Sequence, residues 1–346
     1  ILDSDTLEIP FWMFRFEELL DIIYAGRKPT SDEADALYDL IKSAKARFAV
    51  TMPPPVAPPQ GNLLRRLSPQ AVDAANISAD TPTPYRMADA IKIIDEWTGQ
   101  LERRFSVADL RALRARLELL ARDPRFRFMF SKGLVEDNMA RILSGVFRVP
   151  DDGKRVTIVQ LAGLPNEVVN SVVSVLARLA FEIAVWSRGG FEIALVCEEA
   201  HRYIPNDRSL GFLPTRQAIG RIAKEGRKYG ACLAVVSQRP SELDSTVLSQ
   251  CSTMFAMRLP NDADKAIIRA ALGESSASII SFLSSIADRE AIAFGEAIPT
   301  PMRMKFADAE RRATREEERQ AAPPIGPHDL ARVIARLRGE GAAELG

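Results

Sequence analysis

Two adjacent carboxylates, Glu198 and Glu199, follow directly after a short apolar run, Ile193 to Cys197. A run of that length, rich in β-formers, predicts a fully buried strand with the acids at its C-terminal tip. In open α/β sheets, ligands bind outside the carboxyl ends of the strands. Two acids there suit nucleotide hydrolysis, because one can orient Mg²⁺ and the other can polarise the attacking water. A solvated acidic helix start would have the same sequence, since acids favour the first turn.

A pair of cations, Arg227 and Lys228, ends the helix that is predicted after this strand. Both follow Gly226, where another backbone or another subunit can approach closely. A guanidinium at this place can reach a phosphate across an interface, which is the role of an arginine finger. The alternative is that the cations only complement the dipole at the C-terminus of the helix.

A glutamine, Gln238, lies at the end of a second apolar run, within the segment Ser-Gln-Arg-Pro at 237–240. At the tip of a neighbouring strand, its amide can hydrogen-bond the γ-phosphate or the water and so sense which nucleotide is bound. The alternative is a plain turn, because proline cannot continue a β-ladder. No zinc site is predicted at His201, because the only other histidine, His328, lies in the C-terminal tail.

A phosphate-binding loop of the form Gly-x-x-x-x-Gly-Lys-Ser/Thr does not occur in the sequence. Two segments that resemble it in part begin at Gly26 and Gly153, but neither lies between a predicted strand and a predicted helix, as that loop requires. The sequence begins with Ile1 rather than methionine. We therefore expect it to be the C-terminal portion of a longer protein whose upstream part carries the loop.

The composition is that of an ordinary globular protein, with 346 residues, of which 47% are hydrophobic and 27% charged. The 46 basic and 46 acidic residues balance, so any nucleic-acid contact must come from a local patch. Three cysteines (Cys197, Cys232 and Cys251) lie in or beside apolar runs, which predicts small buried side chains in a reducing compartment. No membrane span and no signal peptide are predicted, so a cytoplasmic location is expected.

The N-terminal half of the sequence has mainly helical periodicity. Helices are predicted at 17–25, after Ser31 as the capping residue, at 85–104 and from Ser106. Their buried stripes are expected at Leu37, Leu40, Ile41, Ala44 and Phe48, and at Leu110, Leu113, Leu117 and Leu120. Residues 51–64 are rich in proline, which predicts a stiff loop.

From residue 156 onward, strand and helix patterns alternate. Strands are predicted at 156–161, 193–197, 231–238, 253–259 and 290–296, and helices at 166–186, 215–229, 263–272 and 275–286. This alternation predicts a mainly parallel sheet that is covered on both faces.

Several motifs occur together in a fixed order. They are Val-Cys-Glu-Glu-Ala-His-Arg-Tyr-Ile-Pro at 196–205, Ile-Ala-Lys-Glu-Gly-Arg-Lys-Tyr-Gly at 222–230 and Val-Ser-Gln-Arg-Pro-Ser-Glu-Leu-Asp at 236–244, followed by further matches at 248–253 and 294–304. Together they resemble the HerA family of hexameric DNA translocases, in the FtsK–HerA branch of RecA-like P-loop ATPases.

The resemblance is dense over about 150–306 and implies an α/β fold, a RecA-like P-loop ATPase core with a mainly parallel sheet. Leu7–Trp12 also resembles the segment that follows the first sheet strands of the family. The implied organisation is 1–29 as part of the ATPase core, 30–125 as a helical insertion, 126–306 as the rest of the core and 307–346 as a charged helical tail.

The resemblance also implies roles for individual residues. Glu198 takes the place of the Walker B acid that assists Mg²⁺, where many relatives have aspartate, Glu199 that of the catalytic glutamate, and Gln238 that of the sensor. Arg227 is the candidate finger. Arg239, also a nucleotide-contacting candidate, and Arg221 are the alternatives. The loop residues Arg202, Arg208 and Arg216 are candidates for DNA contact in a ring pore.

The implied function is ATP-driven movement on DNA by a homohexamer that uses ATP and Mg²⁺. Similar proteins drive a nuclease partner of the NurA type or an effector of bacterial phage defence, and no membrane partner is expected. A conjugation or secretion ATPase is a second interpretation. A non-catalytic or truncated ring that scaffolds a partner enzyme is a third; the missing phosphate loop supports it, and the intact acidic pair and Gln238 argue against it.

Overall fold

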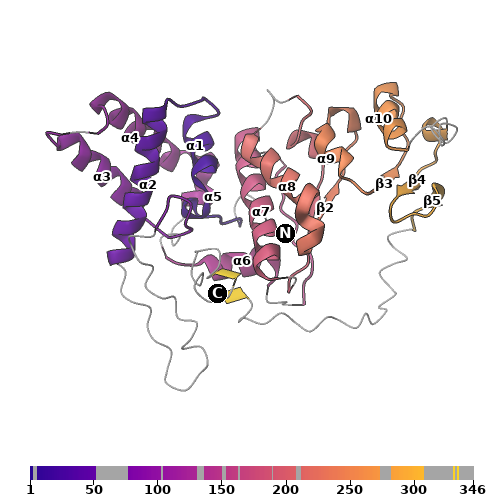
Figure 1. The fold of residues 1–346 in the computed structure, drawn as a ribbon, viewed down its shortest axis with the longest axis horizontal. Coiled ribbons are helices and arrows are strands. Elements are labelled where there is room, and N and C mark those ends of the chain that lie inside the picture. Colours follow the sequence, from indigo (N-terminus) through magenta and orange to yellow (C-terminus); the bar gives the residue numbers. More distant parts are fainter. Residues whose placement is uncertain are drawn as a thin grey trace, which may run out of the picture. The chain divides into compact units, whose positions relative to one another are not determined.

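The structure, a computed structural model, describes residues 1–2, 6–51, 77–102, 104–130, 136–149, 153–162, 164–188, 190–207, 212–272, 282–307, 330–331 and 333–334. The chain divides into two compact units, whose helices and strands are shown in Figure 1. The first comprises 1–193, 212–218 and 324–346, and the second 194–211 and 219–323.

The first unit is helical. Its elements are η1 (Phe11–Met13), α1 (Phe16–Tyr24), α2 (Ser31–Thr51), α3 (Met87–Gly99), α4 (Val107–Arg122), η4 (Pro124–Phe126), α5 (Arg127–Phe130), α6 (Met139–Phe147) and α7 (Asn166–Trp186). Helices α2, α3 and α4 pack on one another, and α1 packs on α7. The predicted apolar stripes of α2 and α4 are confirmed, since every member of both is buried. The status of 30–125 as an insertion stays a prediction.

The start of α2 is fixed one residue earlier than the sequence suggested. Thr30, rather than Ser31, is the capping residue: its Oγ1 accepts a hydrogen bond from the N–H of Glu33 at 3.2 Å. The Glu33 carboxylate accepts in return from the N–H of Thr30 at 2.9 Å. This reciprocal pair is a capping box, which satisfies two donors that the first turn would otherwise leave without partners.

Helix α7 is the central element of the first unit and coincides with the helix predicted at 166–186. By length and composition it could cross a membrane, contrary to the expectation from the sequence, because its most apolar stretch has a mean hydropathy of 1.8. However, 83% of that stretch is buried inside the structure. The helix also buries Ser171, Ser174 and Glu182. These features are typical of the core helix of a water-soluble unit.

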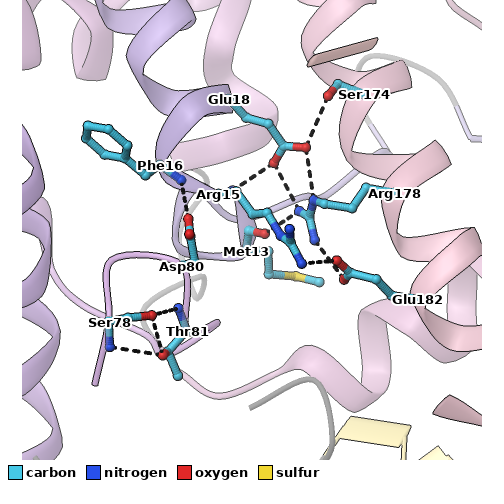
Figure 2. A network of polar contacts seen from close by, with 10 residues as sticks. All are labelled: Met13, Arg15, Phe16, Glu18, Ser78, Asp80, Thr81, Ser174, Arg178 and Glu182. Atoms are coloured by element: carbon cyan, nitrogen blue, oxygen red, sulfur yellow. Dashed lines mark hydrogen bonds and ion pairs between the residues drawn. The ribbon is translucent and has the colours of Figure 1, made fainter. Parts of the chain in front are cut away.

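A buried ionic network joins α7 to α1 and to the segment before it (Figure 2). Arg178 donates to both oxygens of Glu18, at 2.9 and 3.0 Å, to Glu182 at 3.1 Å and to the carbonyl of Met13 at 2.8 Å. Arg15 pairs with the other oxygen of Glu182. Burial alone would lower the pKa of Arg178, but the two carboxylates outweigh it, so the pKa is raised.

Replacing Arg178 with methionine is expected to destabilise the chain by about 3–5 kcal/mol, because Glu18 and Glu182 would be left buried without their main cation. Denaturant unfolding of the 346-residue chain measures this change. The matched control is Arg141→Met, which removes an exposed ion pair to Glu8 and should cost less than about 1 kcal/mol. Equal effects of the two substitutions would contradict the assignment of Arg178 as the centre of the network.

The second unit contains the strands that carry the sequence motifs. A two-stranded sheet pairs β1 (Ile193–Cys197) with β2 (Ala231–Val235), and α8 (Leu213–Tyr229) connects them. Beyond the end of β2, Val236 donates its N–H to the Cys197 carbonyl at 2.9 Å and accepts from the N–H of Ala200 at 3.0 Å. The segments at the C-terminal ends of the two strands are thus bonded to each other, which is the arrangement of parallel strands, as predicted for this pair.

A separate three-stranded sheet contains β3 (Thr253–Ala256), β4 (Glu290–Gly295) and β5 (Met302–Lys305), in that order. Both pairings are antiparallel, so the prediction of a parallel sheet is wrong here. A short turn joins β4 to β5, which favours antiparallel neighbours. One face packs on a small core with Ile268, Leu283 and Ile286, while Phe255 is 50% exposed. Antiparallel sheets can leave one face solvated.

The remaining elements of the second unit are short, apart from α10 (Asp262–Leu272). They are η5 (Ala200–Arg202), η6 (Pro240–Glu242), α9 (Ser245–Ser249) and η8 (Phe282–Ser284).

The strand predicted at 156–161 is wrong in the described structure. Only Val159 pairs, through an isolated parallel bridge to Leu2, and Val156 is 74% exposed. A β-pattern without a continuous neighbour forms no strand, because its ladder hydrogen bonds need a partner. The proline-rich segment, most of the helix predicted at 275–286 and most of the tail lie outside the described residues.

Candidate functional site

The polar tips of β1 and β2 lie together. Glu198 and Glu199 follow β1, and Ser237 and Gln238 follow β2 by two and three residues. The bonds of Val236 to Cys197 and Ala200 bring the two chain segments alongside at this edge. The predicted neighbouring positions of the acidic pair and of Gln238 are therefore confirmed.

The Glu199 carboxylate has a partner on each oxygen. Gln238 donates from Nε2 to Glu199 Oε1 at 2.7 Å. On the other side, Nδ1 of His201 lies 3.4 Å from Glu199 Oε2. The Glu199 side chain is 39% exposed, so it is held in place and still open to a small molecule such as water.

Glu199 also has an unusual backbone conformation, with φ 49° and ψ 47° in the left-handed region. A residue with a Cβ in this region costs about 1–2 kcal/mol. The turn allows β1 to pass directly into η5, so the acidic pair, His201 and Arg202 follow one another in a tight bend.

The loops that follow the two tips are bonded to each other. The N–H of Asp244 donates to the carbonyl of Ile204 at 2.9 Å, and that of Asn206 to the carbonyl of Glu242 at 2.7 Å. An antiparallel bridge between Pro205 and Leu243 lies between these bonds. Backbone hydrogen bonds thus hold the segment that carries Glu198 and Glu199 against the segment that carries Gln238.

Glu198 is exposed beside Glu199, and its carboxylate suits Mg²⁺, which binds oxygen ligands. Within the described residues there is no group of three or more His, Cys, Asp and Glu side chains that could hold a metal by themselves. Mg²⁺ in nucleotide sites is usually held by one or two carboxylates together with waters and phosphate oxygens. Glu198 fits that kind of partial donor set.

The candidate finger, Arg227, lies at the end of α8 with 89% of its side chain exposed. Its Nη1 is 2.9 Å from Oε2 of Glu296, which follows β4. The preceding Gly226 is explained within the chain, because a Cβ there would lie 2.2 Å from the carbonyl oxygen of Ala231. Close approach of α8 to the start of β2 therefore requires glycine at this position.

The other candidate arginines lie on different elements of the chain. Arg239 pairs with Glu242 at 2.9 Å, and Arg221 lies 4.0 Å from Glu225 on α8. Arg202 is exposed on η5 in the second unit, Arg216 belongs to the first unit, and Arg208 lies outside the described residues. A role of these three arginines in DNA contact stays a prediction.

The prediction that β1 is fully buried is wrong in the described structure. Exposed and half-buried residues alternate along β1, and Val196 is 58% exposed. Ala234 of β2 is exposed too. Cys232 shares this exposure, which contradicts the expectation of a buried thiol. Cys197 is buried, and burial raises its pKa to about 12. All three cysteines are free thiols.

Two contacts of the site were not found from the sequence. One is the contact of His201 with the Glu199 carboxylate, for which the only signal in the sequence is that the two residues are two positions apart. The pairing of Arg227 with Glu296 joins residues 69 apart in the chain. No local pattern signals such a contact.

Comparisons with known proteins support the family that the motifs indicate. The family model described as helicase HerA, central domain, matches residues 1–180, which is more than half of the chain. This match includes the helical segment that motif comparison assigned to a variable insertion.

Several curated archaeal proteins are similar to parts of the chain. The DNA double-strand break repair helicase HerA of Sulfolobus acidocaldarius is 31% identical over 158 residues, which are 44% of this chain and 31% of that protein. The DNA double-strand break repair helicase HerA of Pyrococcus furiosus is 35% identical over 111 residues, which are 32% of this chain and 20% of that protein. A probable HerA of Methanocaldococcus jannaschii is 37% identical over 115 residues, or 33% and 22%. The matched part of the chain thus spans a third or less of the length of these relatives.

Proposed function

Because the chain belongs to the HerA helicase family, we propose that it forms the hydrolytic side of an ATP-driven DNA translocase or helicase that works as a homohexameric ring. The names of its relatives describe helicases of DNA double-strand break repair, which supports DNA as the partner. The observation that carries the proposal is the contact of Gln238 with the Glu199 carboxylate beside Glu198.

In this proposal Glu199 accepts a proton from the water that attacks the terminal phosphate, acting as a general base. Gln238 holds one carboxylate oxygen at 2.7 Å, so the other oxygen and its lone pairs keep a fixed direction. The same amide can also turn toward a phosphate oxygen, which would couple the orientation of Glu199 to the bound nucleotide.

ATP supplies the phosphoryl group and Mg²⁺ neutralises charge on it when both are bound. Glu198 would help to hold Mg²⁺ through water, and the contacts to the phosphates would come from residues other than the acidic pair. Arg227 of the neighbouring subunit would stabilise the developing charge, since an exposed guanidinium can leave a surface ion pair at little cost.

We further propose a cytoplasmic protein whose motor drives a nuclease of the NurA type or an effector of phage defence. Arg202 remains a candidate for DNA contact in the ring pore, because it is exposed and follows the acidic pair by three residues. Arg208 and Arg216 stay candidates by sequence alone.

The test is ATP turnover of the full-length protein with and without duplex and single-stranded DNA, together with its mass in solution. We expect DNA to raise turnover and the mass to be that of a hexamer. A ring that assembles and binds its partner enzyme, yet hydrolyses no ATP under any DNA condition, would instead favour the scaffold interpretation.

A further inference from the structure

A histidine lies between the two halves of the candidate site. Nδ1 of His201 is 3.0 Å from Oγ of Ser237 and 3.4 Å from Oε2 of Glu199. Ser237 is the residue before Gln238, and Gln238 holds the other oxygen of the same carboxylate. Two residues of the acidic turn therefore contact two adjacent residues that follow β2.

We propose that His201 is a positioning residue for hydrolysis. Its contacts with Glu199 and Ser237 hold the Glu199 carboxylate in the orientation in which Gln238 also binds it. This inference rests on the proposed function, in which Glu199 activates water. His201 itself need not touch the nucleotide, because its Nδ1 is already directed at Glu199 and Ser237.

The hydrogen-bonding capacity of each group determines the arrangement. An ionised carboxylate only accepts, so an attractive contact with Glu199 requires the proton of His201 to be on Nδ1. Oγ of Ser237 accepts a hydrogen bond from the backbone N–H of Arg239 at 3.0 Å. Its second lone pair can accept from the proton on Nδ1 of His201. The Nδ1–H would then be shared between Glu199 and Ser237.

Burial makes the histidine suitable for this task. Its side chain is 18% exposed, compared with 39% for Glu199, so the ring is the more firmly held of the two. Glu199 lies in a backbone conformation that is costly for glutamate. A carboxylate on such a turn needs side-chain contacts to select one orientation, and Gln238 and His201 supply one on each oxygen.

The test uses the full-length protein with His201→Ala, His201→Asn and Asn206→Ala. We expect His201→Ala to lower kcat for ATP by about 10- to 100-fold, the range found for residues that orient metal ligands from the outer shell, while KM stays near the wild-type value. His201→Asn should recover part of the loss, because its amide nitrogen can donate from nearly the same place as Nδ1. Asn206 is the control: it is exposed on the same loop, and alanine keeps its backbone bond to Glu242, so turnover should stay unchanged.

A second measurement separates this inference from the proposed function. Melting temperatures of His201→Ala, Glu199→Gln and the double variant form a cycle that needs no turnover, and the two changes should be non-additive. If wild-type protein hydrolyses no ATP, the proposed function fails, and the cycle then decides only whether His201 positions the Glu199 carboxylate. Additive effects, or full kcat in His201→Ala, would overturn the role of His201.

Discussion

Replacing Glu199 with glutamine is expected to reduce ATP turnover of the full-length protein by a factor of about 10²–10⁴, because a general base contributes that much to the rate. The amide keeps the shape of the side chain but cannot accept the proton of the attacking water. Binding of ATP should be retained, since Glu198 and the phosphate contacts are unchanged. Steady-state kinetics and equilibrium binding of a fluorescent ATP analogue measure the two quantities separately.

The matched control for this substitution is Glu192→Gln, which changes an exposed acid just before β1. It should leave turnover at the wild-type level. Turnover close to wild type in Glu199→Gln would remove Glu199 from the proposed chemistry. The left-handed turn at Glu199 is as costly for glutamine as for glutamate, so the substitution should not change the backbone. Loss of ATP binding in the same variant would therefore point to an unexpected structural effect.

Replacing Arg227 with alanine is expected to reduce turnover by about 10³-fold or more, which is the usual contribution of an arginine finger. The side chain is 89% exposed, and its partner in the same chain, Glu296, is 67% exposed, so the pair adds little to stability. A large loss of turnover with little change in melting temperature would therefore reflect a role in hydrolysis rather than in folding. Lys228→Ala, at the next position of α8, is the control.

Mixed rings decide whether Arg227 acts between subunits. Arg227→Ala protein retains Glu199, and Glu199→Gln protein retains Arg227, so each supplies what the other lacks. If the arginine reaches a neighbouring site, mixing two inactive proteins restores part of the turnover. If it acts only within its own subunit, no complete site can form in the mixture and turnover stays absent.

The helices and the core of the first unit could be predicted well, because they depend on local periodicity. The stripe from Leu37 to Phe48 repeats every three or four residues and is buried as expected. Lys45 shows the limit of this reasoning. It is fully buried, donates to the carbonyls of Ala79 and Thr81 at 2.6 Å each, and has its pKa lowered by burial to about 7.

Sheet pairing was less predictable, since it depends on which segments become neighbours. The apolar run at 156–161 has the same pattern as β1, yet only Val159 pairs. The strand β5 was not predicted, because Met302–Lys305 is short and alternates with charged residues. At the site, the position of the acids beside Gln238 could be predicted, because both follow the ends of predicted neighbouring strands. The contact of His201 with Ser237 could not, because it joins residues 36 apart in the chain.

The left-handed turn at Glu199 means that the site and the fold favour different residues at this position. Glycine would relax the backbone, since it adopts positive φ at no steric cost, but it would lose the side-chain contacts with Gln238 and His201. It would also remove the carboxylate from the edge of the sheet. A redesign that replaces residues of positive φ with glycine would therefore remove the carboxylate to which we assign the activation of water. Position 199 is one to hold fixed in any such redesign.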